Sequence, residues 1–134
     1  MNTALPTKAL LLIDDDRDDR ELFGEAIASI GSSLLVHFAE NGKEAFDTLA
    51  KSVELPQLIF LDINMPVMDG WQFLKEIKLN ERYSNIPIAM YSTSSLQRDI
   101  NKAYEMGAAF FIVKPSDYTE LKGLLANVIA GLDN

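Results

Sequence analysis

Charged and hydroxyl side chains stand at the ends of several short apolar runs in this sequence. Asp14 and Asp15 follow LLLI, Asp62 follows LIFL, Ser92 closes IPIAMYS, and Lys114 follows FFIV. Carboxylates are ligands of Mg²⁺, which also keeps waters and phosphate oxygens in its shell, and a lysine ammonium pairs with anions. These residue types therefore suit a Mg²⁺ site that also holds an anionic group, provided that the fold brings them together.

Five apolar runs supply the elements that must position these side chains. Their near-continuous hydrophobic character predicts strands that are buried on both faces of a parallel sheet. Each run is followed by apolar residues at helical spacing, and Gly31 and Gly107 end two of these helices. Five strands alternating with five helices indicate right-handed crossovers and an α/β domain whose sheet is covered on both sides. The predicted strands are residues 8–13, 34–39, 57–62, 86–92 and 109–114.

The carboxyl ends of parallel strands meet at one edge of the sheet, where ligands collect. The topology therefore predicts that Asp14, Asp15, Asp62, Ser92 and Lys114 gather at that edge. Three carboxylates at one place repel one another unless a cation lies between them. Each residue alone has an ordinary explanation as a turn acid, a helix cap or a loop lysine. The set of five is what indicates a site.

Further acids follow the first pair. Asp16, Asp18 and Asp19 stand at the start of the first predicted helix, where carboxylates bond free N–H groups and favour the helix dipole. We interpret all three as helix-start residues with no part in the chemistry. His37 is the single histidine, and without a second histidine or a cysteine to share a metal we interpret it as structural.

Length and composition indicate one small globular domain. The chain has 134 residues, 48% hydrophobic and 24% charged. It contains no cysteine, which excludes disulfides and thiolate metal sites. We expect a flexible N-terminal arm over residues 1–7 and a domain over residues 8–131, which leaves no room for a second domain.

The net charge of −8 argues against binding to nucleic acid or to an anionic membrane surface. The N-terminal residues lack the features of a signal peptide, and no apolar stretch approaches the roughly 20 residues that span a bilayer. We expect a cytoplasmic protein that is a monomer or a weak dimer.

Four motifs carry a resemblance to a known family: LLIDDD, LIFLDINMPVMDG, IPIAMYSTSS and GAAFFIVKP. With them the chain resembles, over essentially its whole length, the receiver domain of two-component response regulators, and among these the stand-alone, single-domain kind. The resemblance implies a flavodoxin-like, doubly wound, five-stranded parallel sheet with strand order 2-1-3-4-5 and five helices. It also implies a signalling protein that is not an enzyme and that catalyses only its own phosphorylation and dephosphorylation.

The resemblance assigns roles to the predicted site residues. It implies that Asp62 accepts a phosphoryl group from a histidine kinase or a histidine phosphotransfer protein. Asp14 and Asp15 match the acidic pair that holds Mg²⁺ together with Asp62, and Asn64 matches the residue whose backbone carbonyl completes the metal site. An aspartate that attacks a phosphoryl group needs its own charge and that of the phosphoryl neutralised, which supports these roles.

The remaining matches concern how the signal leaves the site. Lys114 matches the lysine that pairs with the phosphoryl group, Ser92 the switch hydroxyl and Phe111 the switch aromatic. The departures from the family pattern are mild: threonine is commoner at the position of Ser92, and tyrosine is also frequent at that of Phe111. The resemblance further implies a cis Lys114–Pro115 bond. It implies output through the surface of the fourth helix, fifth strand and fifth helix, toward a protein target that the sequence does not identify.

Other functions fit less well. A phosphatase of the haloacid-dehalogenase type needs a second acid two residues after its nucleophile, where this chain has Asn64. A flavodoxin-like electron carrier needs a Ser/Thr/Gly-rich loop after the first strand, where this chain has acids. A P-loop enzyme needs a Gly-rich Lys-Ser/Thr loop, which this sequence lacks. The alternative that remains is a receiver fold that binds partners without being phosphorylated, and the intact set of five residues argues against it.

Overall fold

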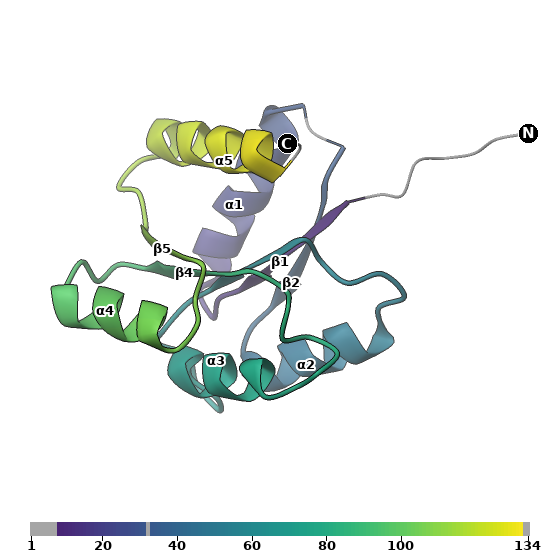
Figure 1. The fold of residues 1–134 in the computed structure, drawn as a ribbon. Coiled ribbons are helices and arrows are strands. Elements are labelled where there is room, and N and C mark those ends of the chain that lie inside the picture. Colours follow the sequence, from purple (N-terminus) through teal and green to yellow (C-terminus); the bar gives the residue numbers. More distant parts are fainter. Residues whose placement is uncertain (1–7, 32, 133–134) are drawn as a thin grey trace, which may run out of the picture.

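A computed structural model describes residues 8–31 and 33–132. The predicted N-terminal arm, residues 1–7, lies outside the described residues. Strands and helices alternate throughout the described part of the chain (Figure 1). The strands are β1 (Ala9–Ile13), β2 (Leu35–Ala39), β3 (Leu58–Leu61), β4 (Ile88–Ser92) and β5 (Phe110–Val113). The helices are α1 (Arg17–Ser29), α2 (Gly42–Lys51), α3 (Gly70–Lys78), α4 (Gln97–Glu105) and α5 (Tyr118–Leu132).

The strands form one parallel sheet in the order β2-β1-β3-β4-β5, which confirms the predicted order. Ile13, the last residue of β1, is in register with Ala39 of β2 and with Leu61 of β3. The chain leaves β1 toward β2 and later continues on the other side of β1 with β3. The carboxyl end of β1 therefore lies at the point where the winding of the sheet reverses, which is where ligands bind in open α/β sheets.

Helices cover both faces of the sheet (Figure 1). In β1, Leu11 and Ile13 belong to the core shared with α2, α3 and α4, whereas Leu10 and Leu12 belong to the core shared with α1 and α5. Successive side chains of a strand point to opposite faces, so a continuous apolar run supplies both cores at once.

The two outer strands differ from the sequence prediction. Leu35 and Phe38 of β2 are exposed, and so are Phe110 and Val113 of β5. The expectation of burial on both faces is confirmed for β1, β3 and β4 and is wrong for β2 and β5. An outer strand has a neighbouring strand on one side only, and the helices leave part of each rim uncovered.

Local signals set several helix ends. Asp16 caps α1, because its Oδ1 accepts a hydrogen bond of 3.1 Å from the N–H of Asp19. Gly31 and Gly107 follow α1 and α4 with φ of 76° and 98°, a backbone region that glycine enters without steric cost. The predicted ends at these glycines are confirmed. None of the helices in the described part of the chain is long and apolar enough to cross a membrane.

Candidate functional site

Three aspartates meet at the carboxyl edge of the sheet. Asp14, Asp15 and Asp62 each offer a carboxylate oxygen, and these oxygens lie within 4.8 Å of one another. The sheet ladder continues past the strand ends and fixes two of these residues: the N–H of Asp14 donates to Ala39 O at 3.0 Å, and that of Asp62 donates to Ile13 O at 2.9 Å. The structure thus brings together the three acids that the sequence analysis placed at this edge.

The acids differ in burial. Asp14 and Asp62 are buried, whereas Asp15 is exposed at the rim. Burial is the main cause that raises the pKa of Asp62, to about 7, and the charges of Asp14 and Asp15 raise it further, while Lys114 acts in the opposite direction. The protein alone therefore stabilises the Asp62 carboxylate poorly. A hard divalent cation, which prefers oxygen ligands, fits this donor set.

Lys114 brings a positive charge to the same edge. Its Nζ lies 2.8 Å from Asp14 Oδ2, 2.9 Å from Asp19 Oδ2 and 3.8 Å from Asp62 Oδ2. Burial alone would lower the pKa of Lys114, but its hydrogen bonds to Asp14 and Asp19 outweigh burial and raise that pKa above its usual value. The lysine is therefore a fixed cation. The carboxylates of Asp14, Asp15, Asp19 and Asp62 outnumber this lysine and Arg20, whose guanidinium donates to the backbone oxygen of Asp14 at 2.8 Å, so negative charge is in excess at this edge.

Ser92 and Phe111 lie on the neighbouring strands. Ser92 ends β4 with 1% of its surface exposed, and its Oγ accepts a hydrogen bond of 3.1 Å from the N–H of Ser94. The N–H of Lys114 donates to Ser92 O at 2.8 Å, which ties the ends of β4 and β5 together. Phe111 is partly buried against the core that includes α4, and its N–H donates to Tyr104 Oη at 3.1 Å.

The loop between β3 and α3 folds back over Asp62. A Cβ at Gly70 would overlap the backbone oxygen of Asp62, so a residue without a side chain is needed there. The N–H of Gly70 donates to Ile63 O at 2.7 Å and closes the loop. Asn64, the residue predicted to offer its carbonyl to a metal, lies exposed in this loop.

The same loop contains a strained residue. Val67 has φ of 69°, in the region that β-branched residues avoid, and it is 77% exposed. The N–H of Met68 donates to Pro66 O at 2.7 Å, which closes a γ-turn of the rarer hand. Backbone strain of this kind is commonly found beside functional sites.

A family model for the response regulator receiver domain matches residues 10–126. The match spans the three acids, Ser92 and Lys114. The chain belongs to this family. Receiver domains are the signalling domains of two-component systems that accept phosphate from histidine kinases, and the acidic cluster corresponds to the site for phosphorylation and a divalent metal ion.

Two curated relatives illustrate the range of this receiver family. The response regulator Rre1 of Synechocystis is 33% identical over 122 residues, which cover 91% of this chain and 52% of Rre1. The chain thus spans about half the length of that relative. A chemotaxis protein CheY homolog of Campylobacter jejuni is 32% identical over 120 residues, and here the match covers 90% of this chain and 91% of the relative.

Two solved receiver structures have the same fold. The phosphorylated cyanobacterial phytochrome response regulator RcpA has a TM-score of 0.83 and 29% identity, with 91% of each chain covered. The Mn²⁺-bound form of the response regulator Rcp1 has a TM-score of 0.79 and 26% identity, with 90% of this chain and 91% of Rcp1 covered. A phosphorylated relative and a metal-bound relative therefore share the fold described above.

The Lys114–Pro115 bond of this receiver domain is trans, since no cis peptide bond occurs within residues 8–31 and 33–132. The prediction of a cis bond is wrong. A trans X–Pro bond is intrinsically favoured by about 0.5–1 kcal/mol. Lys114 reaches Asp14 with the trans geometry, so its contact with the acids does not depend on a cis bond.

Asp19 is the site residue that the sequence analysis missed. Its local pattern is the same as that of Asp16 and Asp18, which predicts a helix-start acid, and Asp16 does cap α1. Asp18 is exposed. Asp19 instead bonds Lys114, 95 residues away in the sequence. Helical side chains tilt toward the helix N-terminus, so an acid in the first turn after a site-bearing strand can reach back to the site; that position is the signal that could have identified Asp19.

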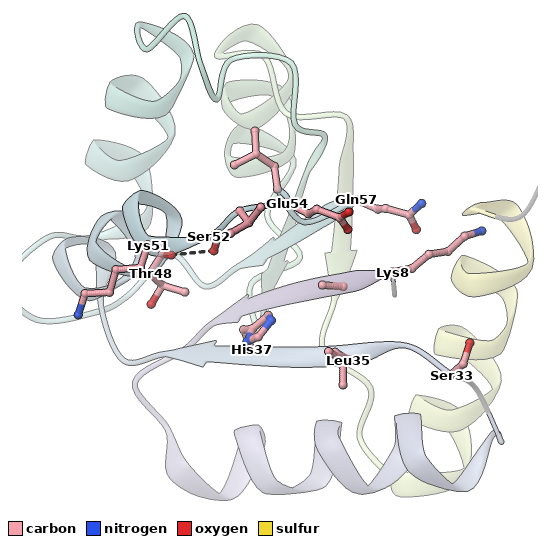
Figure 2. Close-up of a pocket in the computed structure, with 12 residues that line it drawn as sticks. Lys8, Ser33, Leu35, His37, Thr48, Lys51, Ser52, Glu54 and Gln57 are labelled. Carbon is pink, nitrogen blue, oxygen red and sulfur yellow. Dashed lines mark hydrogen bonds between the residues drawn. The ribbon is translucent and has the colours of Figure 1, made fainter. Parts of the chain in front are cut away.

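A hollow lies elsewhere, beside the amino ends of β1, β2 and β3 (Figure 2). Its volume is about 1070 Å³, and Lys8, His37 and Lys51 are among the residues that line it. In Figure 2 the side chains of Lys8 and Lys51 extend away from each other. Because its charged groups do not converge, this hollow offers no alternative to the acidic edge as the site of chemistry.

Proposed function

We propose that this chain is a response regulator of the single-domain type that accepts a phosphoryl group on Asp62 from a histidine kinase or a histidine phosphotransfer protein. The observation that carries the proposal is the position of the buried Asp62 carboxylate, between two further carboxylates and a lysine ammonium. That arrangement offers a nucleophile, ligands for a cation and a fixed positive charge within a few ångströms. An aspartyl-phosphate chemistry needs all three.

The transfer is a displacement at phosphorus. A deprotonated oxygen of Asp62 forms the new P–O bond while the P–N bond of the donor phosphohistidine breaks, and the imidazole leaves with the bonding electron pair. A bound Mg²⁺, held by Asp14, Asp15, Asp62 and the backbone carbonyl of Asn64, would neutralise charge on the carboxylate and the phosphoryl oxygens. Lys114 pairs with another phosphoryl oxygen, and the Ser92 hydroxyl can donate to a third.

The charge of the site explains why a cation belongs to this reaction. The pKa of Asp62 is raised to about 7 mainly by burial, and the neighbouring acids raise it further. A protonated carboxyl group is a poor nucleophile. A divalent cation held by Asp14, Asp15 and Asp62 would favour the charged form of Asp62, so that the reactive carboxylate would be present near neutral pH.

The output surface that we propose is formed by α4, β5 and α5. A hollow of about 580 Å³ lies between these elements and includes Tyr104, Phe110 and Phe111 in its lining. Tyr104 and Phe110 are about half exposed. Phe111 borders this hollow and the buried core, so a change in its position alters the shape that a partner protein meets.

The proposal is tested by incubating the protein with Mg²⁺ and acetyl phosphate and measuring its intact mass. We expect a gain of one phosphoryl group that needs Mg²⁺, disappears in Asp62→Asn and persists in Asp47→Asn, a control at an exposed acid of α2. Absence of the gain in the wild-type protein, with acetyl phosphate and with a panel of phosphorylated histidine phosphotransfer domains, would overturn the proposal in favour of an interaction module that works without phosphorylation. A gain that persists in Asp62→Asn would overturn the assignment of Asp62.

A further inference from the structure

Lys114 has two hydrogen-bonded partners and one donor to spare. Its ammonium carries three N–H groups. Asp14 Oδ2 and Asp19 Oδ2 lie at 2.8 and 2.9 Å, whereas Asp62 Oδ2 lies at 3.8 Å, beyond a hydrogen bond. Two donors are thus bound to fixed carboxylates, and the ammonium is next to Asp62 with its third donor available.

The two partners of Lys114 differ in what else they do. Asp14 belongs to the cluster of acids whose oxygens lie within 4.8 Å of one another, so a metal ion bound in that cluster would share its charge. Asp19 is outside that cluster. Its backbone N–H donates to the cap residue Asp16. Within the described parts of the chain, Lys114 is the one cation that pairs with Asp19.

Asp19 and Lys114 meet beside the start of α1 and are both partly covered. Asp19 lies in the first turn of α1, and its side chain is 36% exposed. With Lys114 it lines a small cavity of about 200 Å³ beside the loop that leads into α5. The Nζ of Lys114 also lies 5.4 Å from the ring centre of Tyr91. The lysine side chain is only 11% exposed, and Asp19 is the anionic partner that it has outside the acidic cluster.

We propose that Asp19 is a positioning residue for phosphoryl transfer, which holds the ammonium of Lys114 so that its free N–H is directed at the phosphoryl group on Asp62. The inference rests on the proposed function of Asp62. A metal ion bound in the acidic cluster would share the charge of Asp14, whereas the hydrogen bond from Lys114 to Asp19 would be unaffected. Without Asp19 the long lysine side chain gains rotational freedom, and fewer molecules present the donor to the phosphoryl group.

The kinetic test compares phosphorylation by acetyl phosphate in the wild-type protein, Asp19→Ala and Asp19→Asn. We expect the rate at saturating donor to fall about tenfold in Asp19→Ala, which corresponds to ~1.4 kcal/mol. The KM for acetyl phosphate should stay the same or fall, because the variant removes a negative charge that repels the anionic donor. Asp19→Asn retains an oxygen acceptor and should lie between the two.

Asp18→Ala is the matched control. Asp18 precedes Asp19 in the same turn of α1 and is exposed, so its removal changes the local charge equally without touching Lys114. Its saturating rate should equal that of the wild-type protein. A general loss of stability in the Asp19 variants is excluded by working well below their melting temperatures.

A spectroscopic measurement tests the anchor without any phosphorylation. In ¹⁵N-labelled protein, the Lys114 ammonium should give a resolved ¹H–¹⁵N signal that exchanges slowly with water, with and without Mg²⁺. In Asp19→Ala this signal should broaden in the metal-free protein and vanish when Mg²⁺ is added, because Asp14 is then shared with the metal. Asp19→Asn provides the same test if the alanine variant does not fold.

The outcomes separate the two proposals. A wild-type protein that takes up no phosphoryl group overturns the proposed function, whatever the state of the lysine signal. A wild-type protein that is phosphorylated, together with Asp19 variants of unchanged saturating rate or unchanged lysine signal, overturns the positioning role alone. A reduced rate with the altered signal, both absent from Asp18→Ala, supports it.

Discussion

At the scale of single residues, the site is defined by a conflict between burial and charge. Asp62 is 7% exposed and has two other carboxylates beside it. Burial, Asp14 and Asp15 all favour its protonated form, and Lys114 opposes them only in part. An ionised Asp62 therefore destabilises the metal-free protein. A bound cation, or a phosphoryl group together with a cation, can reduce this cost.

The raised pKa of Asp62 predicts a pH dependence of stability. Between its ordinary value of 3.8 and about 7, the folded protein holds a proton on Asp62 that the unfolded chain has released. In the presence of a chelator, the free energy of unfolding should therefore fall as pH rises through this window, by at most ~1.4 kcal/mol per unit of pKa difference. Above about pH 7 this contribution levels off.

Urea titrations at pH 5 and pH 8 measure this dependence. Asp62→Asn should lose less stability than the wild-type protein between the two pH values, because its amide does not titrate. Asp47→Asn, at an exposed acid, should follow the wild-type protein. Parallel behaviour of wild type and Asp62→Asn would contradict the raised pKa.

At the scale of elements, α4 and β5 are joined by an unusual hydrogen bond. β5 is an outer strand, so some of its N–H groups face away from the sheet. The N–H of Phe111 donates to Tyr104 Oη at 3.1 Å. Tyr104 therefore links the position of α4 to the backbone of the predicted switch residue, in addition to any packing of the Phe111 ring.

Tyr104→Phe should loosen this link without affecting the acidic edge. We expect a loss of ~0.5–1.5 kcal/mol in stability, because one hydrogen bond is removed and the freed N–H can be solvated. Amide hydrogen exchange at Phe111 should become faster, while Mg²⁺-dependent phosphorylation of Asp62 continues.

Tyr118→Phe is the control, because Lys122 lies over the Tyr118 ring and this contact does not use the hydroxyl. Equal exchange at Phe111 in both tyrosine variants would show that the Tyr104 hydroxyl does not hold β5.

At the scale of the whole molecule, negative charge dominates. The chain has a net charge of −8. At the carboxyl edge of the sheet, Asp14, Asp19 and Asp62 lie within 4 Å of the Lys114 ammonium, and Asp15 lies beside two of these acids. Mutual repulsion of these acids lowers the stability of the metal-free fold. A ligand that binds the folded state alone raises stability by mass action, by about 2.7 kcal/mol when its concentration is 100 times its Kd.

Mg²⁺ should therefore raise the melting temperature by several degrees, an effect to be measured against NaCl of equal ionic strength as a control for screening. Asp15→Asn removes one repelling charge from the exposed rim. It should raise the melting temperature of the metal-free protein and reduce the further increase with Mg²⁺. Melting curves of both proteins that do not respond to millimolar Mg²⁺ would exclude a cation site at this edge.

Much of this architecture follows from local patterns. Apolar runs alternating with helical spacing identify the five strands and five helices of the described chain, and glycines mark two helix ends. Because parallel strands end at a common edge, those patterns also place Asp14, Asp15, Asp62 and Lys114 together. These features depend on neighbours within a few residues and on one general rule of sheet topology, so the sequence alone is sufficient for them.

Other features were decided by tertiary structure. An apolar run does not state whether its strand is central or outer, so the exposure of β2 and β5 depends on strand order and helix placement. The pairing of Asp19 with Lys114 joins residues 95 positions apart, and Asp18 beside it has the same local signal and a different environment. Two acids in the first turn of a helix have the same local preference for that position. They differ in the direction that each faces, and that direction has a consequence only once the helix is packed on the sheet.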